Sequence, residues 1–373
     1  MSWILTTDEI TRLQVELTNY CNAGCPHCAR VNYLSSDWLQ GYREKSPYPV
    51  SINSTHLSLE RYKQMIDNDQ WQSLRDVHYC GNYDEPTIHP QIFEFIDYTA
   101  NNIKGIQSIS IATNGGTRDK EWWQRLAQKS VELKQRDIQL RVIWGIDGLE
   151  DTNHIYRKGV DWNKLKENYT AYNQAGGDST WQIIVFEHNE HQLNEIENNY
   201  KAWGFNSIKI INSNRKNPQI KIDKSTKKKY VQHDTQDKIK NTPIKKKAPV
   251  STPKNDVILE KNDVILEKKD TIFCKALEKN SIIKRSLYIT AHGFVTPCCW
   301  MGTDRSLKEG ASSFSQGLPP EIHSIYSQES ISDILNSQYF SELQLAWKDR
   351  SYVTCNEKCS TAHNPDIQSI IKR

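Results

Sequence analysis

The chain of 373 residues has no stretch that approaches the roughly 20 consecutive apolar residues of a membrane-spanning helix. Its first ten residues, MSWILTTDEI, have neither a positively charged start nor a long apolar segment, so no signal peptide is visible. We therefore expect a cytoplasmic protein with no membrane partner. Clustered cysteines in a reducing compartment more often bind metal than form disulfides, and the odd count of nine argues against complete internal pairing.

Arginine and glycine are absent from residues 221–270, and Tyr230 is the only aromatic residue there. The segment holds 14 Lys against 8 Asp or Glu, a balance of +6, so the rest of the +3 chain is near −3. It also repeats KNDVILE, at Lys254–Glu260 and Lys261–Glu267. We interpret residues 216–270 as a Lys-rich linker or mobile loop. A nucleic-acid-binding arm is the alternative, but such arms use arginine and stacking aromatics, so we expect no nucleic-acid partner.

The first 215 residues alternate segments typical of strands with segments typical of helices. We expect strands at Leu13–Thr18, Asp76–Cys80, Ser108–Thr113, Gln139–Ile146, Trp181–Phe186 and Ser207–Ile211. Amphipathic helices are expected near residues 59–67, 90–102, 119–134, 162–175 and 190–203. This alternation indicates parallel strands joined by right-handed crossovers, with chemistry at their carboxyl ends. Six units are too few for a closed eight-fold barrel, so we predict an α/β fold with a partial (β/α)6 TIM-like barrel; a doubly wound sheet is the alternative.

Three cysteines follow the first expected strand. Cys21, Cys25 and Cys28 lie in the segment CNAGCPHC, with the spacing C-x3-C-x2-C. A cubane iron–sulfur cluster has four irons and usually takes four thiolates, so three thiolates on one loop leave one iron open. An open position is where a substrate or cofactor binds, as at catalytic zinc sites. The alternative is a zinc knuckle that His27 or a distant residue completes.

The spacing, its place after the first strand and the local sequence resemble those of the radical S-adenosylmethionine (SAM) superfamily. The resemblance covers roughly residues 10–215. It implies a [4Fe–4S] cluster on Cys21, Cys25 and Cys28, with an open iron that chelates the amino and carboxylate groups of SAM. In that family an electron from the cluster cleaves SAM to methionine and a 5′-deoxyadenosyl radical, which abstracts a hydrogen atom from the substrate. The resemblance also implies a reductant such as flavodoxin or ferredoxin.

Further segments carry the resemblance to the SAM site. The segment CGNYDEP is similar to the family's Gly-Gly-Glu-Pro segment, but its extra residues leave open whether Asp84 or Glu85 takes the carboxylate role. Arg157 is expected at the SAM carboxylate, because a guanidinium suits bidentate binding; a surface position is the alternative. His27 either stacks near adenine or is a solvated loop residue. The SAM-binding residues that the resemblance implies are His27, Gly81, Asn82, Asp84, Glu85, Asn114, Asp147, Arg157 and Asn189, with no catalytic residue assigned.

A second set of cysteines lies in the C-terminal region. The segment GFVTPCCW resembles the hairpin of the SPASM and twitch extensions of radical SAM enzymes. This implies an auxiliary [4Fe–4S] cluster on Cys274, Cys298, Cys355 and Cys359, with Cys299 as a substitute for Cys298. The late pair is C-x3-C where the family more often has C-x2-C, and no cysteines remain for another cluster, which favours the shorter twitch form. A structural zinc site is the alternative. We expect Cys80 to be a buried core residue.

These observations divide the chain into a radical SAM core domain at residues 1–215, the linker or mobile loop at 216–270, and a small α+β auxiliary-cluster domain at 271–373. Enzymes with this extension modify peptides or proteins, or oxidise small molecules. The first hypothesis is therefore modification of a peptide or protein side chain. The alternatives are dehydrogenation or rearrangement of a small molecule and, from another class, a non-catalytic iron–sulfur or zinc protein.

Overall fold

The computed structural model describes residues 6–28, 55–212, 274, 276–277, 285–302, 320–349, 355 and 369–372. Its strands are β1 (Arg12–Val15), β2 (Asp76–Tyr79), β3 (Ser108–Thr113), β4 (Gln139–Gly145), β5 (Asp178–Val185), β6 (Ser207–Asn212), β7 (Ser286–Ile289), β8 (Val295–Thr296) and β9 (Ser369–Lys372). Its α-helices are α3 (Leu59–Asp67), α4 (Ile92–Asn102), α5 (Lys120–Lys134), α6 (Asn153–Tyr156), α7 (Trp162–Gln174), α8 (Leu193–Asn199), α11 (Ile331–Leu335) and α12 (Gln338–Asp349). Short 3-10 helices are η1 (Thr7–Glu9), η2 (Pro86–Ile88), η3 (Glu190–Gln192) and η4 (Pro320–His323).

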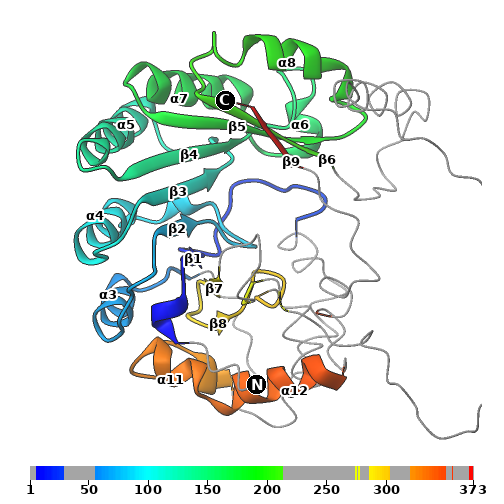
Figure 1. Cartoon of the computed structure of the whole chain (residues 1–373). Helices are drawn as coiled ribbons and strands as arrows, with labels where there is room; N and C mark the ends of the chain where they lie inside the picture. The colour runs from blue at the N-terminus through cyan, green and yellow to red at the C-terminus, as the bar shows by residue number, and fades with distance from the viewer. Residues whose placement is uncertain are drawn as a thin grey trace, which may run out of the picture.

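One curved sheet organises the described residues, with the strand order β8-β7-β1-β2-β3-β4-β5-β6-β9. Neighbours from β7 through β6 run parallel, whereas β8 and β9 pair antiparallel at the two ends. The helices α3, α4, α5, α7 and α8 lie along the outer side of the sheet, as Figure 1 shows. The end strands do not pair with each other within this sheet. The fold is therefore an α/β partial barrel rather than a doubly wound sheet, which carries helices on both faces.

The six strands and five helices expected in the first 215 residues are confirmed, with ends that move by a few residues. Local sequence explains where the helices begin. Ser58, Asp119 and Asp161 are N-caps whose side chains accept hydrogen bonds from the free main-chain N–H groups of the first turn of α3, α5 and α7. The expected helix near 190–203 is shorter, because η3 precedes α8.

The space between helices and sheet is filled by large side chains. Trp123 of α5 lies 4.4 Å from Trp144 of β4, centroid to centroid, and Tyr172 of α7 completes an edge-to-face cluster with both; all three are fully buried. Aromatic clusters of this kind add to the free energy gained from burial alone. None of the helices in the described part of the chain has the length and apolarity to cross a membrane.

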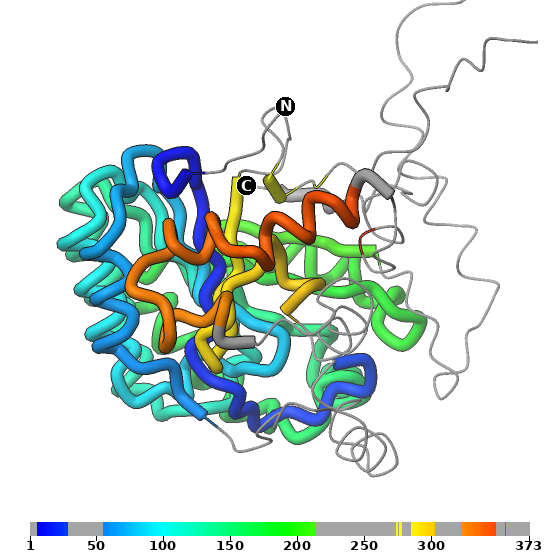
Figure 2. The backbone as a smooth tube through the Cα atoms, turned by 90° about the horizontal axis from the view of Figure 1, so that it is seen from below, coloured from blue at the N-terminus to red at the C-terminus, as the bar shows by residue number. Residues whose placement is uncertain are grey.

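The C-terminal region joins the same sheet, which the sequence did not lead us to expect. Strand β7 pairs parallel with β1, from Arg12 opposite Ser286 to Val15 opposite Ile289. Hydrogen bonds from Ile331 and Ser332 of α11 to Asp69 fix this region against the core. Figures 1 and 2 show α11 and α12 running past β7 and β8 beside the N-terminal segment. The described strands of the C-terminal region, β7, β8 and β9, therefore extend the barrel sheet. The segment 216–270 lies outside the described residues.

Candidate functional site

The three N-terminal cysteines lie on the loop that leaves the carboxyl end of β1. The N–H of Gly24 donates to the carbonyl of Lys158 at 2.7 Å, and that of Cys28 donates to Cys25 O at 3.0 Å. Cys25 is buried, and Cys21 and Cys28 are half-buried. One main-chain hydrogen bond from outside the loop and one within it thus hold three thiols on one short segment, at the end of the barrel where parallel-strand folds place their chemistry.

Burial affects the acidity of two of the three thiols, Cys21 and Cys25. Burial raises the pKa of Cys21 to about 12, and the nearby Glu85 carboxylate adds to the rise. Burial also raises the pKa of Cys25, against the opposing effect of the Arg157 guanidinium. The side-chain amide of Asn114 approaches Cys21 Sγ at 3.7 Å. Because a metal ion displaces the proton of a coordinating thiol, the cysteines become thiolates when iron binds.

The number of thiols on this loop suits a cluster with one open iron. In a cubane each thiolate binds a different iron. Three thiols on one loop would therefore supply three of the four irons and leave the fourth free for another ligand. Cys21, Cys25 and Cys28 are compatible with a [4Fe–4S] cluster on these grounds.

Glu85 braces the strand ends beside the cysteine loop. It is 1% exposed. Its carboxylate accepts hydrogen bonds from the hydroxyls of Thr87 and Thr113, both at 2.6 Å, and from the N–H of Asn114 at 2.7 Å. Burial raises the pKa of Glu85, while the hydrogen bonds from Thr113 and Thr87 oppose the rise. With a further bond from Thr87 N–H at 3.4 Å, Oε1 accepts from three donors, while Oε2 accepts from Asn114 alone.

Asp84 has fewer hydrogen-bond donors around it than Glu85. Its Oδ1 accepts from the N–H of Gly81 at 2.7 Å, and the main-chain N–H groups of Gly81 and Leu17 both act to lower its pKa. Its Oδ2 is buried, with no donor in hydrogen-bond geometry among the residues that the structure describes. Burial, followed by the Glu16 carboxylate, raises the pKa of Asp84 well above its usual range. A buried oxygen without a donor is costly, so a cationic ligand at this oxygen would be favoured.

Glu16 is a site residue that the sequence analysis missed. It follows β1, is 1% exposed, and its Oε1 accepts from the N–H groups of Asn82 and Tyr83, both at 2.8 Å. A Cβ atom on Gly81 would lie 2.2 Å from Glu16 Cγ, so only glycine permits this approach. The available signal was a charged residue inside an expected strand, since a buried carboxylate needs dedicated donors.

Asp147 and Arg157 form an ion pair at the carboxyl end of β4. Arg157 Nε donates to Asp147 Oδ2 at 2.7 Å, and the Asp147 side chain is fully buried. Burial lowers the pKa of Arg157, but Asp147 and then Cys25 outweigh it, so the guanidinium stays charged beside the cysteine loop. Asn189 uses its whole amide inside the protein, donating to Asp147 O and Ile184 O and accepting from Phe186 N–H. Its side chain holds the end of β5 in place.

His27 lies among aromatic rings. Its ring centroid is 6.0 Å from that of Tyr156 and 6.4 Å from that of Phe186, and Tyr156 and Phe186 are 4.4 Å apart. This apolar, stacked surrounding differs from that of a solvated loop histidine. The structure thus brings His27, Asp84, Asn114 and Arg157 around the cysteine loop.

Comparisons with known proteins agree with this geometry. A family model described as the radical SAM superfamily matches residues 15–198, and one described as an iron–sulfur cluster-binding domain, SPASM, matches residues 281–360. The chain belongs to the radical SAM superfamily. It is a radical SAM enzyme with a SPASM domain, and a [4Fe–4S] cluster and SAM are its cofactors. No curated protein matches the chain.

Solved structures share the fold of this radical SAM enzyme. Native anSMEcpe with bound AdoMet aligns at 12% identity with a TM-score of 0.50, covering 92% of this chain and 84% of that chain. SuiB of Streptococcus suis bound to S-adenosylmethionine aligns at 14% identity with a TM-score of 0.47, covering 79% of this chain and 61% of that chain. At 12% identity, the similarity to anSMEcpe is evidence for a shared fold alone.

The C-terminal cysteines of the radical SAM enzyme come from segments far apart in the chain. Cys274 and Cys355 are buried, and Met301 Sδ, three residues beyond Cys298, lies 4.0 Å from Cys355 Sγ. Cys299 lies against the core: its carbonyl accepts from the Asn82 side chain at 2.7 Å, and its thiol is close enough to Cys80 to raise the pKa of that residue. Cys359 lies outside the described residues. Cys80, expected to be a buried core residue, is half-buried. Burial raises the pKa of its thiol well above the usual range.

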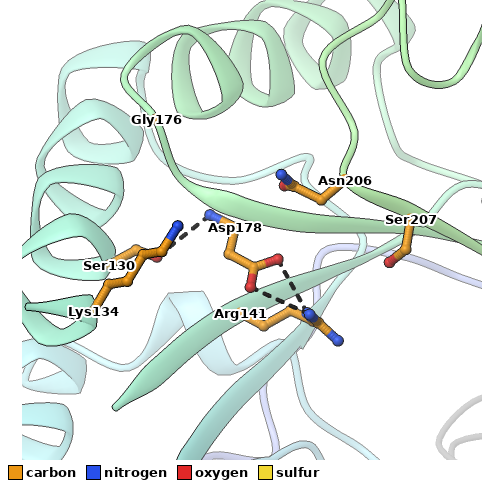
Figure 3. Close-up of a pocket in the computed structure, with 7 residues that line it drawn as sticks. All are labelled: Ser130, Lys134, Arg141, Gly176, Asp178, Asn206 and Ser207. Carbon is orange, nitrogen blue, oxygen red and sulfur yellow. Dashed lines mark hydrogen bonds and ion pairs between the residues drawn. The ribbon is translucent and has the colours of Figure 1, made fainter. Parts of the chain in front are cut away.

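A hollow of about 220 Å³ lies at the opposite, amino ends of β4, β5 and β6 (Figure 3). Arg141 and Asp178 point toward each other across it, with Nε 3.1 Å from Oδ1 and Nη2 3.2 Å from Oδ2. The two charges therefore satisfy each other. The cysteine loop, at the carboxyl end of the barrel, is remote from this hollow.

Proposed function

We propose that this enzyme cleaves SAM reductively at the N-terminal cluster and uses the resulting radical to modify a peptide or protein side chain. The observation that carries the proposal is the placing of three thiols on one braced loop beside Asp84, whose buried Oδ2 has no donor in hydrogen-bond geometry among the described residues. The cluster, when bound, supplies the electron and the open iron for SAM. Cys21, Cys25 and Cys28 hold it.

The side chains around the loop take separate roles in this proposal. Asp84 Oδ2 accepts from the SAM ammonium, while Glu85 holds Asn114 in position next to Cys21. Arg157, oriented by its ion pair with Asp147, offers its remaining N–H groups to the SAM carboxylate. His27, between Tyr156 and Phe186, contributes to an apolar wall for adenine.

A peptide is the proposed substrate class because the sheet is open. In the part of the chain that the structure describes, β8 and β9 end the sheet without pairing with each other, so the described barrel does not close around the carboxyl ends of its strands. Solved structures of anSMEcpe and SuiB are described with bound peptides, Cp18Cys and the precursor SuiA respectively. A small molecule remains the second candidate from the sequence.

The auxiliary cluster is assigned to Cys274, Cys298, Cys355 and Cys359. Cys298 is preferred over Cys299 because the contact of Met301 with Cys355 brings the Cys298 turn to Cys355, whereas the Cys299 thiol lies near Cys80 and raises the pKa of that thiol. A cluster with four thiolates accepts or relays electrons instead of binding substrate. The proposed domains remain residues 1–215, 216–270 and 271–373, with a flavodoxin or ferredoxin as reductant.

The test is release of 5′-deoxyadenosine by the anaerobically reconstituted, reduced enzyme. Candidate peptides and small molecules, each deuterated at a candidate carbon, are then supplied in turn. Deuterium in 5′-deoxyadenosine from a peptide supports the proposal, and transfer only from a small molecule supports the second candidate. Iron-loaded protein that neither binds nor cleaves SAM would indicate the non-catalytic alternative.

A further inference from the structure

The acidic loop that carries Asp84, residues 81–84, is held by both modules of the protein, the N-terminal core and the C-terminal auxiliary-cluster region. Glu16 Oε1 accepts from Asn82 and Tyr83 N–H, while its Oε2 accepts from the N–H of Ala291 at 3.1 Å. Ala291 lies in the turn between β7 and β8. One buried carboxylate therefore joins the acidic loop of the core to the hairpin that leads into Cys298.

Two more hydrogen bonds cross the same boundary. The side chain of Asn82 donates to Cys299 O at 2.7 Å, and its N–H also reaches the hydroxyl of Tyr288 at 3.1 Å. The main-chain N–H and the side-chain amide of Asn82 are thus directed at Glu16 or at the C-terminal region. Its carbonyl in turn accepts from Cys28 Sγ at 3.6 Å, so the same residue touches the cysteine loop.

We propose that Glu16 and Asn82 are positioning residues that make SAM binding depend on the seating of the β7–β8 hairpin of the auxiliary-cluster domain. Glu16 sets the conformation of residues 81–84 through two N–H groups, and the hairpin sets the position of Glu16 through a third. Asn82 closes the link at Cys299, next to the proposed cluster ligand Cys298. The inference rests on the proposed role of Asp84 in SAM binding.

The structure offers a matched control for Asn82. Asn68 also donates its side-chain amide across the boundary, to the carbonyl of Glu329 at 2.8 Å, but far from the acidic loop. Asn68→Ala and Asn82→Ala therefore each remove one hydrogen bond of the same type between the two modules. Only Asn82→Ala touches residues 81–84, and it leaves the N–H groups that donate to Glu16 in place.

The experiment measures SAM binding by equilibrium dialysis and amide hydrogen exchange at residues 81–85, in the full chain loaded with its clusters. Glu16→Gln has one carbonyl oxygen where two carboxylate oxygens now accept, so we expect SAM affinity to fall about tenfold. Asn82→Ala should lower it roughly threefold and speed exchange at Tyr83, with Asn68→Ala within about twofold of wild type.

The outcomes separate the two proposals. Unchanged SAM affinity and exchange in both Glu16→Gln and Asn82→Ala overturn the inference, as does an equal loss in Asn68→Ala, which would mean general loosening of the two modules. If Glu16→Gln does not fold, Asn82→Ala against Asn68→Ala still decides. If the wild type binds no SAM, the proposed function fails, while exchange at Tyr83 still decides whether the hairpin controls the loop.

Discussion

The two sets of cysteines in this enzyme are built in opposite ways. Cys21, Cys25 and Cys28 lie within eight residues of sequence on one loop, whereas Cys274, Cys298 and Cys355 come from three separate segments. The first set needs only one loop held at the end of one strand. The second set needs the whole C-terminal region to fold against the barrel. Substitutions at the auxiliary site should therefore lower the stability of the fold, while substitutions at the N-terminal site should affect catalysis alone.

The largest contrast is expected from single cysteine substitutions. Cys25→Ala should abolish SAM cleavage, because the loop cannot hold the cluster with two thiolates. Cys355→Ala should retain part of it, since the N-terminal cluster is intact, but should lower stability, because Trp347 Nε1 and Met301 both contact this sulfur. Production of 5′-deoxyadenosine and thermal unfolding are measured together. Cys80→Ala, outside both sets, is the control; equal activity of the Cys25 and Cys355 variants would erase the contrast.

The two acidic residues should separate binding from stability. Asp84→Asn removes the carboxylate with the open oxygen, so SAM affinity should fall about tenfold with little change in unfolding. Glu85→Gln places an amide among four donors, and we expect a loss of roughly 2–3 kcal/mol in the free energy of unfolding. Titration with SAM and chemical denaturation give the two quantities. If instead Glu85→Gln lowered SAM affinity and Asp84→Asn lowered stability, Glu85 would be the carboxylate that binds the ammonium group of SAM.

A smaller effect is expected from acid in the C-terminal region. His323 is stacked on Tyr339 at 4.1 Å, and burial lowers its pKa to about 4. The unfolded chain, with a pKa near 6.5, binds this proton first, so stability falls as pH drops below about 6.5. Between pH 7 and pH 5, protonation linked to His323 alone should lower the free energy of unfolding by about 2 kcal/mol. His323→Phe should flatten this slope in denaturation curves; an unchanged slope would place the acid sensitivity elsewhere.

More of the barrel than of the C-terminal region could be predicted from the sequence, for physical reasons. In the barrel, alternating periodicity and local caps such as Asp119 and Asp161 define elements one at a time, so strands and helices were predictable. The spacing of Cys21, Cys25 and Cys28 is local as well. The pairing of β7 with β1 joins residues more than 270 positions apart and has no local signal. Neither Glu16 nor the hydrogen bonds to Glu85 could be predicted, because both depend on donors from other segments.

The most direct test of the central claim uses the Cys355→Ala variant, in which only the N-terminal set of cysteines is complete. The variant is reconstituted anaerobically, its iron and zinc are counted, and the EPR spectrum of the reduced protein is recorded with and without SAM. We expect about four irons per chain and a spectrum that changes when SAM is added. Zinc in place of iron at Cys21, Cys25 and Cys28, or an iron signal that SAM leaves unmoved, would contradict the central claim.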